Sequence, residues 1–324
     1  MTTESPRVAI TGAAGYIGSR VVYKLQEEHP DWDIVALDNF YLGQVREIGD
    51  VRVEHLDIRH RDRLEEKLEG ADVVIHLAAV SGVKDCDQNS DLAFEVNVHG
   101  TNNVAWFCKK TGAALVFPFS MAVLGDPQAF PITVDQPRAP LNWYGRTKLL
   151  GERAIETLAE DAFPAHLFMI SNVYGEHDIA GKTISKNTVI NFFVNRALDG
   201  EDLTVYKPGT QARNYVHVKD VANAYLRSAE RLVELRERGE TGVEKYEIAS
   251  DEDPSVLDVA ELVQAEAAEL LGTDLDIKLL ENPRSETLVE SFTVDTTQAH
   301  DVLGWEVQHS TEESVRDLLS EAAH

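Results

Sequence analysis

The sequence predicts an α/β fold, a doubly wound parallel sheet with a smaller, interleaved C-terminal domain. Along the first half of the chain, short apolar segments alternate with amphipathic ones, which is typical of parallel strands joined by helices. The first of these strands runs directly into a glycine-rich loop that opens a helix. After Asn172 the composition changes to segments rich in Gly, Pro, Asn and Lys, and the strand and helix patterns return only near residue 246.

The apolar runs are short and rich in Val, Ile, Leu and Ala, as expected of strands that are buried on both faces. The expected strands are 7–11, 33–38, 51–57, 71–79, 113–120, 165–171 and 246–250. Between them the apolar residues recur at helical spacing. The expected helices are 18–28, a segment around Leu64 and Leu68, 91–111, a segment that begins near Tyr144, and 256–271.

The last strand and helix come after the change in composition, so the C-terminal part should interleave with the sheet and not form a separate bead. We expect the first domain to comprise residues 1–174, with returns near 214–250. The second domain should then comprise residues 175–213 and 251–324.

The charge balance limits the choice of partners. The 324 residues carry 56 acidic and 30 basic side chains, a formal net charge of −26, and only 12 of the basic residues are Lys. Such a surface repels nucleic acid and anionic membranes, so we expect neither as a partner. Solubility is one explanation of the acidic excess. We favour adaptation to a salt-rich, halophilic cytoplasm, where ions screen the self-repulsion.

The cysteines and the apolar runs indicate the compartment. Cys86 and Cys108 show neither metal-ligand spacing nor an obvious pairing, so we expect no metal site and a reducing environment. No segment resembling a signal peptide precedes Val8, and no apolar run approaches the ~20 residues that cross a bilayer. The expected location is therefore cytoplasmic.

The glycine loop predicts a dinucleotide site. Gly12, Gly15 and Gly18 are spaced for a tight turn, a close approach of backbone to a pyrophosphate, and a tight contact between helix and strand. The second strand ends in Asp38, 20 residues after Gly18. A carboxylate at that place accepts the ribose hydroxyls of NAD and repels the 2′-phosphate of NADP, so NAD is the expected cofactor.

A tyrosine and a lysine share one face of a predicted helix. Tyr144 and Lys148 are four residues apart in WYGRTK, so their side chains should point the same way. The chain here resembles the extended short-chain dehydrogenases/reductases, in particular the nucleotide-sugar epimerase/dehydratase group. The similar motifs, which run along nearly the whole chain, are TGAAGYIG (11–18), Asp57-Ile58, HLAA (76–79), Tyr144-x-x-x-Lys148, NVYGE (172–176), RNYVHVKD (213–220) and LGW (303–305).

The resemblance implies a Rossmann-type fold and assigns roles to individual residues. Its catalytic set is Ser120, Tyr144 and Lys148, in which the lysine and the positive nicotinamide lower the pKa of the phenol from about 10 toward neutral pH. The implied cofactor contacts are Gly12, Gly15, Tyr16, Ile17, Gly18, Asp38, Asn39, Asp57, Ile58, Leu77, Ala78, Ala79, Asn97, Tyr144 and Lys148. The implied substrate contacts are Ser81, Val83, Ser120, Asn172, Asn187, Tyr206, Arg213 and Arg284.

The expected activity is an NAD-dependent nucleotide-sugar 4-epimerase, with UDP-glucose and UDP-galactose as the default pair. Arg213 and Arg284 match the arginines that clamp the substrate diphosphate in the family, although RSET at 284–287 departs from its usual pattern. Ser120-Met121-Ala122 replaces the carboxyl-bearing run of the dehydratases, which argues against dehydration. The alternatives are a dehydrogenase or reductase that releases NADH, a uronic acid decarboxylase, and a non-catalytic NAD-binding regulator. The resemblance also implies a homodimer, formed through helices near 91–111 and 145–160.

Asp38 provides a test of the cofactor assignment. The protein should bind NAD more tightly than NADP, because a carboxylate that faces a 2′-phosphate loses hydrogen bonds and adds charge repulsion. Replacing Asp38 by Gly or Ser should narrow the preference, as measured by parallel titrations with the two cofactors. Equal affinity of the unmodified protein for both would rule out this role for Asp38.

Overall fold

The computed structural model describes residues 5–43, 45–282 and 289–322. Its centre is a seven-stranded sheet in the order β14-β8-β7-β6-β1-β2-β5, with every neighbouring pair parallel. The strands are β1 (Arg7–Thr11), β2 (Asp33–Asp38), β5 (Glu54–His55), β6 (Val73–His76), β7 (Ala114–Ser120), β8 (Pro164–Ile170) and β14 (Gly242–Ile248). The chain winds outward from β1 to β5 and then outward from β6 in the other direction. The predicted doubly wound α/β fold is confirmed, with its switch point between β1 and β6.

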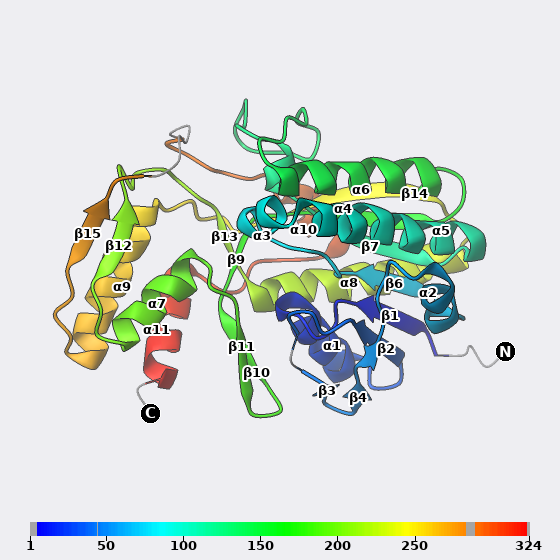
Figure 1. The fold of residues 1–324 in the computed structure, drawn as a ribbon, viewed down its shortest axis with the longest axis horizontal. Coiled ribbons are helices and arrows are strands. Elements are labelled where there is room, and N and C mark those ends of the chain that lie inside the picture. Colours follow the sequence, from blue (N-terminus) through cyan, green and yellow to red (C-terminus); the bar gives the residue numbers. More distant parts are fainter. Residues whose placement is uncertain (1–4, 44, 283–288, 323–324) are drawn as a thin grey trace.

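Helices cover both faces of this sheet (Figure 1). On one face, α1 (Tyr16–Glu28) and α8 (Val218–Glu237) pack together over a cluster that includes Leu25 and Tyr225. The other face carries α2 (Arg61–Leu68), α5 (Thr101–Thr111) and α6 (Trp143–Ala159). Burial on two faces explains why the strands are continuous apolar runs. In the described part of the chain, no helix is both long enough and apolar enough to traverse a bilayer.

The strand predicted over 51–57 does not form as one element. β3 (Glu47–Ile48) and β4 (Val51–Arg52) form a small antiparallel hairpin, and only β5 joins the main sheet. At the open end of this hairpin, the Val53 N–H donates to the Arg46 carbonyl at 2.9 Å. Gly49 supplies the positive φ of 55° in the hairpin turn, so the chain folds back on itself where an extended strand was expected.

The helix predicted over 91–111 is divided by a wider turn. It forms as α4 (Ser90–Phe94), a π-helical segment (Glu95–Gly100) and α5. A Cβ at Gly100 would lie 2.4 Å from the Ile58 Cδ1 atom, so glycine allows the helix to approach the loop after β5. The other boundaries differ by a few residues: α1 begins at Tyr16 and β14 begins at Gly242, both earlier than predicted.

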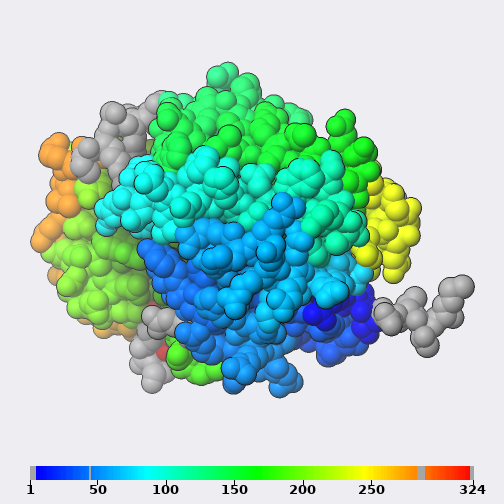
Figure 2. Space-filling model, turned by 45° about the vertical axis from the view of Figure 1, so that its right-hand side comes forward, coloured from blue at the N-terminus to red at the C-terminus, as the bar shows by residue number. Residues whose placement is uncertain are grey.

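A third apolar cluster lies beyond the sheet, on the left in Figure 1. Its elements are α7 (Val189–Leu198), β12 (Leu203–Tyr206), α9 (Val256–Leu271), β15 (Ile277–Leu280) and α11 (Thr311–Ala322). β12 pairs in parallel with β15, and α9 spans the predicted 256–271. In Figure 2 the yellow-green and orange segments form one end of the molecule, whereas the yellow segment near residue 240 lies at the other. We propose that the third cluster is the core of the second domain.

A buried charge cluster fixes helix α6 to its surroundings. The Glu152 side chain is fully buried on α6, and it accepts hydrogen bonds from Arg138 Nη2 at 2.7 Å and from Lys245 Nζ of β14 at 2.6 Å. Burial alone would raise the pKa of the Glu152 carboxyl, but the hydrogen bonds from Arg138 and Lys245 outweigh it and lower the pKa. Arg138 also donates to the Val134 and Gln136 carbonyls, so the same cluster holds the segment before α6 in place.

Replacing Glu152 by Gln should destabilise the fold strongly. The change leaves the buried Arg138 without its counter-charge, which typically costs about 3–5 kcal/mol in free energy of unfolding. Urea unfolding measures the loss. Glu28→Gln is the matched control, because Glu28 pairs with Lys24 on the exposed face of α1 and its replacement should cost far less stability than that of Glu152.

The stability lost in the Glu152→Gln protein should depend on pH. Because the pKa of Glu152 is lower in the folded than in the unfolded chain, its contribution is present above the ordinary value of 4.5 and is lost as the pH falls. The gap between the wild-type and the Glu152→Gln protein should therefore shrink in acid. Equal losses for Glu152→Gln and Glu28→Gln at neutral pH would contradict the assignment.

Candidate active site

A large cleft lies where the winding of the sheet reverses. Its volume is about 980 Å³. It is lined by the carboxyl ends of β1, β2, β6, β7 and β8, by the first turns of α1 and α6, and by a hairpin formed by β10 (Glu176–Ile179) and β11 (Lys182–Ser185). Ligands of doubly wound sheets bind at this position.

The glycine loop is shaped by close backbone contacts. Gly12 has a φ of 74°, and a Cβ there would lie 2.6 Å from the Ala78 backbone nitrogen. At Gly18 a Cβ would lie 2.1 Å from the Gly12 carbonyl oxygen. Gly15 is the N-cap of α1 and provides no side-chain cap. The first-turn N–H groups of α1 are therefore available to a ligand in the cleft.

Asp38 is held at the end of β2, beside the glycine loop. Its carboxylate accepts the Ala14 N–H at 3.0 Å and the Phe40 N–H at 2.6 Å. Burial raises the pKa of Asp38, and these two backbone hydrogen bonds act in the opposite direction. Asp38 and the exposed Asn39 both line the cleft. A carboxylate anchored in this way can accept hydroxyl donors from a ligand without first changing its rotamer.

Tyr144, Lys148 and Ser120 meet at the other end of the cleft. Asn142 caps α6 by accepting the Gly145 N–H at 2.8 Å, which places Tyr144 in the first turn and Lys148 one turn later. Ser120 ends β7, and its hydroxyl lies within hydrogen-bonding reach of Tyr144. The Lys148 amine donates to the Pro118 carbonyl at 3.0 Å and lies over the Phe117 ring.

Burial dominates the ionisation of both catalytic candidates. It raises the pKa of Tyr144 to about 12, although the hydrogen bond with Ser120 lowers it. It also lowers the pKa of Lys148 to about 8, with Cys86 opposing this and Lys186 adding to it. The expectation that Lys148 and the positive nicotinamide together lower the pKa of the phenol stays a prediction, and in the protein alone burial raises that pKa. The desolvation of the phenolate outweighs an ammonium whose own charge is also destabilised.

Most of the predicted site residues come together in this cleft. Those that line it are Gly12, Gly15, Tyr16, Ile17, Gly18, Asp38, Asn39, Ile58, Leu77, Ala78, Ala79, Ser81, Ser120, Tyr144, Lys148, Asn172 and Asn187. Five others are absent from its lining, namely Asp57, Val83, Asn97, Tyr206 and Arg213. Arg284 lies outside the described residues.

The positions of these five have local causes. Both carboxylate oxygens of Asp57 accept hydrogen bonds from Arg59, whose side chain faces the cleft instead. Val83 opens the short helix α3 (Val83–Gln88), and Tyr206 is half exposed on β12. The Arg213 N–H donates to the Pro254 carbonyl, and its guanidinium donates to the Ala212 carbonyl.

Asn97 is a buried connector. Its amide accepts the Val80 N–H at 2.8 Å and donates to the Val80 carbonyl at 3.0 Å and to Thr147 Oγ1 at 3.1 Å. These bonds join the loop after β6 to α6. The π-helical segment places Asn97 toward this loop, and we propose that it positions the catalytic helix and does not touch the cofactor.

Sequence reasoning missed several residues that line the cleft, among them Arg59, Tyr215 and the β11 residues 182–185, together with Lys186. They belong to no motif that spacing could identify. Tyr215 could have been found from its place in RNYVHVKD, but the hairpin residues have no comparable signal.

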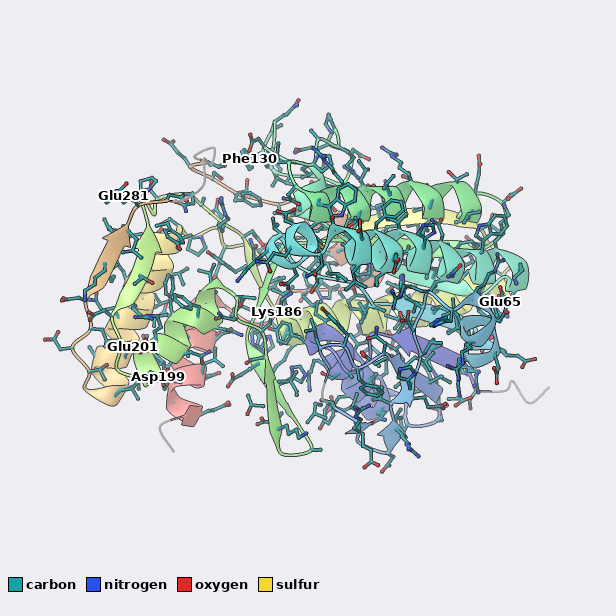
Figure 3. All side chains as sticks on the ribbon, in the orientation of Figure 1. Glu65, Phe130, Lys186, Asp199, Glu201 and Glu281 are labelled. Carbon is teal, nitrogen blue, oxygen red and sulfur yellow. The ribbon has the colours of Figure 1, made fainter. Side chains whose placement is uncertain are left out.

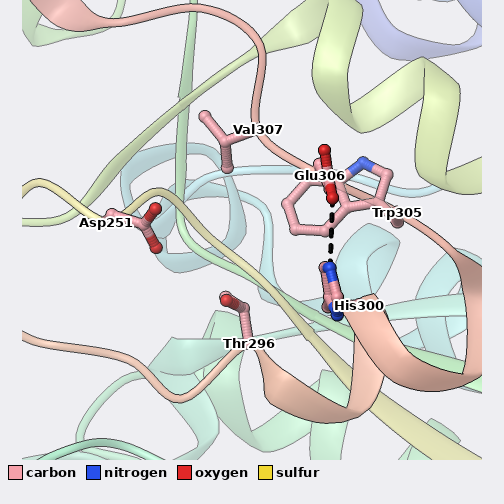
Figure 4. A pocket seen from close by; sticks show the side chains of 6 residues that line it. All are labelled: Asp251, Thr296, His300, Trp305, Glu306 and Val307. Carbon is pink, nitrogen blue, oxygen red and sulfur yellow. Dashed lines mark hydrogen bonds and ion pairs between the residues drawn. The ribbon is translucent and has the colours of Figure 1, made fainter.

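A second cavity, of about 280 Å³, lies beside α10 (Thr297–Leu303) (Figure 4). Its His300 bonds Asp301 at 2.9 Å and Glu306 at 3.0 Å, and these acidic partners raise the pKa of the imidazole. Trp305 of the LGW motif donates its indole N–H to the Asp220 carbonyl at 2.8 Å. His300 and its two acidic partners satisfy one another, and the cavity is smaller, so we assign the active site to the larger cleft.

Known proteins match the chain over most of its length. The model of the NAD dependent epimerase/dehydratase family matches residues 8–247. UDP-glucuronic acid decarboxylase 5 of Arabidopsis thaliana is 31% identical over 317 residues, covering 93% of this chain and 84% of the relative. UDP-glucose 4-epimerase 1 of Oryza sativa subsp. japonica is 28% identical, covering 98% and 94%.

A solved structure is similar over a comparable extent. MoeE5, in complex with UDP-glucuronic acid and NAD, is 28% identical and superposes with a TM-score of 0.79, covering 98% of both chains. The resemblance inferred from the sequence motifs is therefore confirmed. The chain belongs to the NAD-dependent epimerase/dehydratase family of nucleotide-sugar enzymes.

Proposed function

We propose that the protein is an NAD-dependent nucleotide-sugar 4-epimerase. One observation carries the proposal: Ser120, Tyr144 and Lys148 converge in a cleft whose described lining contains a single carboxylate, Asp38, at the opposite end. A site of this kind has a proton-transfer group for one sugar hydroxyl but no second acid at the sugar. Relatives that are named UDP-glucose 4-epimerases support the proposal.

The cleft fits NAD, the cofactor of the family. The close backbone contacts at Gly12 and Gly18 hold the loop tightly against the backbone after β6 and against the start of α1, and the uncapped first turn of α1 offers N–H donors to a phosphate in the cleft. Asp38, held by two backbone amides, would accept the hydroxyls of the adenosine ribose. Lys148, released from the Pro118 carbonyl, would donate to the nicotinamide ribose.

In the proposed reaction each residue has one task. Bound NAD supplies the acceptor and donor of the C4 hydride and a positive charge beside the phenol. Ser120 donates its hydrogen bond to the sugar hydroxyl and orients Tyr144. Tyr144, as the phenolate, removes the proton of the C4 hydroxyl and returns it when the 4-keto sugar is reduced from its other face. The sugar must turn between these steps, so the nucleotide end has to stay anchored.

Dehydration is less compatible with this site. Elimination of water needs an acid and a base at neighbouring carbons, whereas Ser120 is followed here by Met121 and Ala122. Met121 is also buried in a short 3₁₀ turn (Met121–Val123), away from the lining of the cleft. In the described lining no Glu is present, and Asp38 serves the cofactor end.

Decarboxylation of a nucleotide-linked uronic acid is the second candidate. The relatives named UDP-glucuronic acid decarboxylases, at 30–31% identity, favour it. Oxidation at C4 of a uronic acid makes the carboxylate β to a ketone, and carbon dioxide can then leave without a carboxyl side chain from the protein. The same Tyr144 and Lys148 would serve, so the two candidates differ in their product. A dehydrogenase would instead release NADH.

The ionisation of Tyr144 should depend on the cofactor. Without NAD the phenol should titrate near pH 12, as burial dictates, and bound NAD⁺ should lower its pKa. Ultraviolet difference spectra between the wild-type and Tyr144→Phe proteins measure this pKa. Lys148→Ala without NAD should leave it almost unchanged. Ionisation of Tyr144 below its ordinary value of about 10 in the NAD-free protein would mean that Lys148 alone activates it.

The reaction class is tested by a panel of UDP-glucose, UDP-galactose and UDP-glucuronic acid. An epimerase forms the C4 epimer of a substrate without accumulating NADH, which NMR of the products and nicotinamide absorbance follow together. Tyr144→Phe should lower turnover by about 10²–10⁴-fold, the usual loss for a general base, while NAD binding persists. Tyr41→Phe is the control, since Tyr41 lines the cleft but is largely exposed at the cofactor end.

Other products decide against the proposal. A UDP-pentose with release of carbon dioxide would assign the decarboxylase, and stoichiometric NADH would assign a dehydrogenase. Full activity of Tyr144→Phe would remove Tyr144 from the mechanism. No turnover of any nucleotide sugar, with intact NAD binding, would favour a non-catalytic role.

A further inference from the structure

The hairpin β10–β11 brings a cation into the active-site cleft. Its two strands are joined by Ala180 and Gly181, with φ values of 50° and 74°, a two-residue turn that matches the twist of the strands. Ile179 is buried and Ile184 packs against the apolar cluster under α1, so the hairpin is anchored. The inner strand β11 lines the cleft, and Lys186 follows directly after it.

The Lys186 ammonium has a polar anchor but no counter-charge. Its Nζ atom donates to Ser81 Oγ at 3.0 Å, across the cleft from the hairpin. It forms no ion pair with any carboxylate among residues 5–43, 45–282 and 289–322. Burial lowers the pKa of the amine, while Asp85 and Cys86 of α3 act in the opposite direction. Lys186 is nevertheless an exposed residue, so an anionic ligand in the cleft can reach Nζ and pair with its charge.

The Lys186 backbone carbonyl and its ammonium are each hydrogen-bonded to segments that lie next to the glycine loop. The Asn191 amide donates to the Lys186 carbonyl at 3.0 Å and also bonds both backbone groups of Gly175. The Gly175 carbonyl in turn accepts the Tyr16 hydroxyl, from the first residue of α1, at 2.7 Å. Ser81, on the other side, follows the Leu77–Ala78 backbone that contacts Gly12. Figure 3 labels Lys186 where the chain leaves the hairpin β10–β11, between the third apolar cluster and the main sheet.

This position needs a positive charge. A dinucleotide pyrophosphate carries two negative charges, whereas the N-terminus of a helix supplies only about half of one positive charge. The chain as a whole carries −26, so its long-range field opposes an anionic ligand. Arg59, another cation that lines the cleft, is paired with Asp57 and Glu95. Lys148 is bonded to Pro118 at the catalytic end.

We propose that Lys186, anchored by Ser81, binds the pyrophosphate of NAD, so that the hairpin β10–β11 is part of the cofactor site. Lys186 and the first turn of α1 line the same cleft, so the ammonium would provide the charge that the backbone donors lack. Lys186 thereby also links the hairpin to the cofactor. The proposal depends on NAD as the cofactor and is independent of which reaction the sugar undergoes.

The test compares NAD affinity in Lys186→Ala, Lys186→Arg and Lys182→Ala proteins by calorimetric titration at low and high KCl. Removing a charged hydrogen bond should weaken NAD binding by on the order of ten- to a hundredfold at low salt. Lys186→Arg should recover most of this loss, because it keeps the charge. Lys182→Ala makes the same charge change at the other end of β11, beside the hairpin turn and also in the lining of the cleft, and should lose less. High KCl should narrow the gap between the wild-type and Lys186→Ala proteins, because it screens the charge.

Ser81→Ala provides a second variant that leaves the charge in place. It frees the amine from its anchor and should weaken NAD binding in the same direction, but less. Equal losses for Lys186→Ala and Lys182→Ala would overturn the proposal, because they would reflect net charge alone. So would unchanged NAD affinity with weaker binding of UDP-glucuronic acid but not UDP-glucose, which would assign the ammonium to a sugar carboxylate. Since the readout is binding, it remains valid if the epimerase assignment fails.

Discussion

The active-site cleft depends on one close contact, between the glycine loop and the backbone that follows β6. A Cβ at Gly12 would collide with the backbone after β6, and a Cβ at Gly18 would collide with the Gly12 carbonyl inside the loop. Because α1 begins directly from this loop, its first residues are fixed relative to the sheet. Tyr16 then bonds the Gly175 carbonyl, and Ser19 lies 3.0 Å from His177 Nε2 in β10. The hairpin, and with it Lys186, is therefore placed by the same contact that shapes the phosphate site.

Sequence patterns predicted those parts of the fold that the backbone geometry of a single element determines. The glycine spacing, the apolar strands and the four-residue interval between Tyr144 and Lys148 each follow from backbone geometry within one element, and the structure has all three. The division of 51–57 and the π-helical segment could not be read in this way. They depend on a turn at Gly49 and on the packing of Gly100 against Ile58, which are determined by the tertiary structure.

The site was predictable to a similar degree. Residues in motifs at strand ends reach the cleft, because the carboxyl ends of parallel strands share one edge. Asp57 and Asn97 differ because partners that no motif specifies, Arg59 and the Val80 backbone, occupy their polar groups. The pKa shifts that burial causes at Tyr144 and Lys148 could not be predicted, for a related reason. Burial acts on both side chains, and sequence spacing contains no measure of burial.

The late position of the edge strand β14 in the sequence affects how the chain folds. Residues 242–248 pair with β8 along its whole length, although the intervening chain passes through the third apolar cluster and back. During synthesis β8 therefore emerges long before its partner, with one row of backbone donors and acceptors unpaired and apolar side chains on both faces. Such an edge recruits other strands, so the nascent N-terminal half has a need for chaperone protection that ends only when β14 arrives. High sequence separation of this pairing also predicts slow closure of the sheet. A fragment that ends at residue 174 would leave the same edge open permanently.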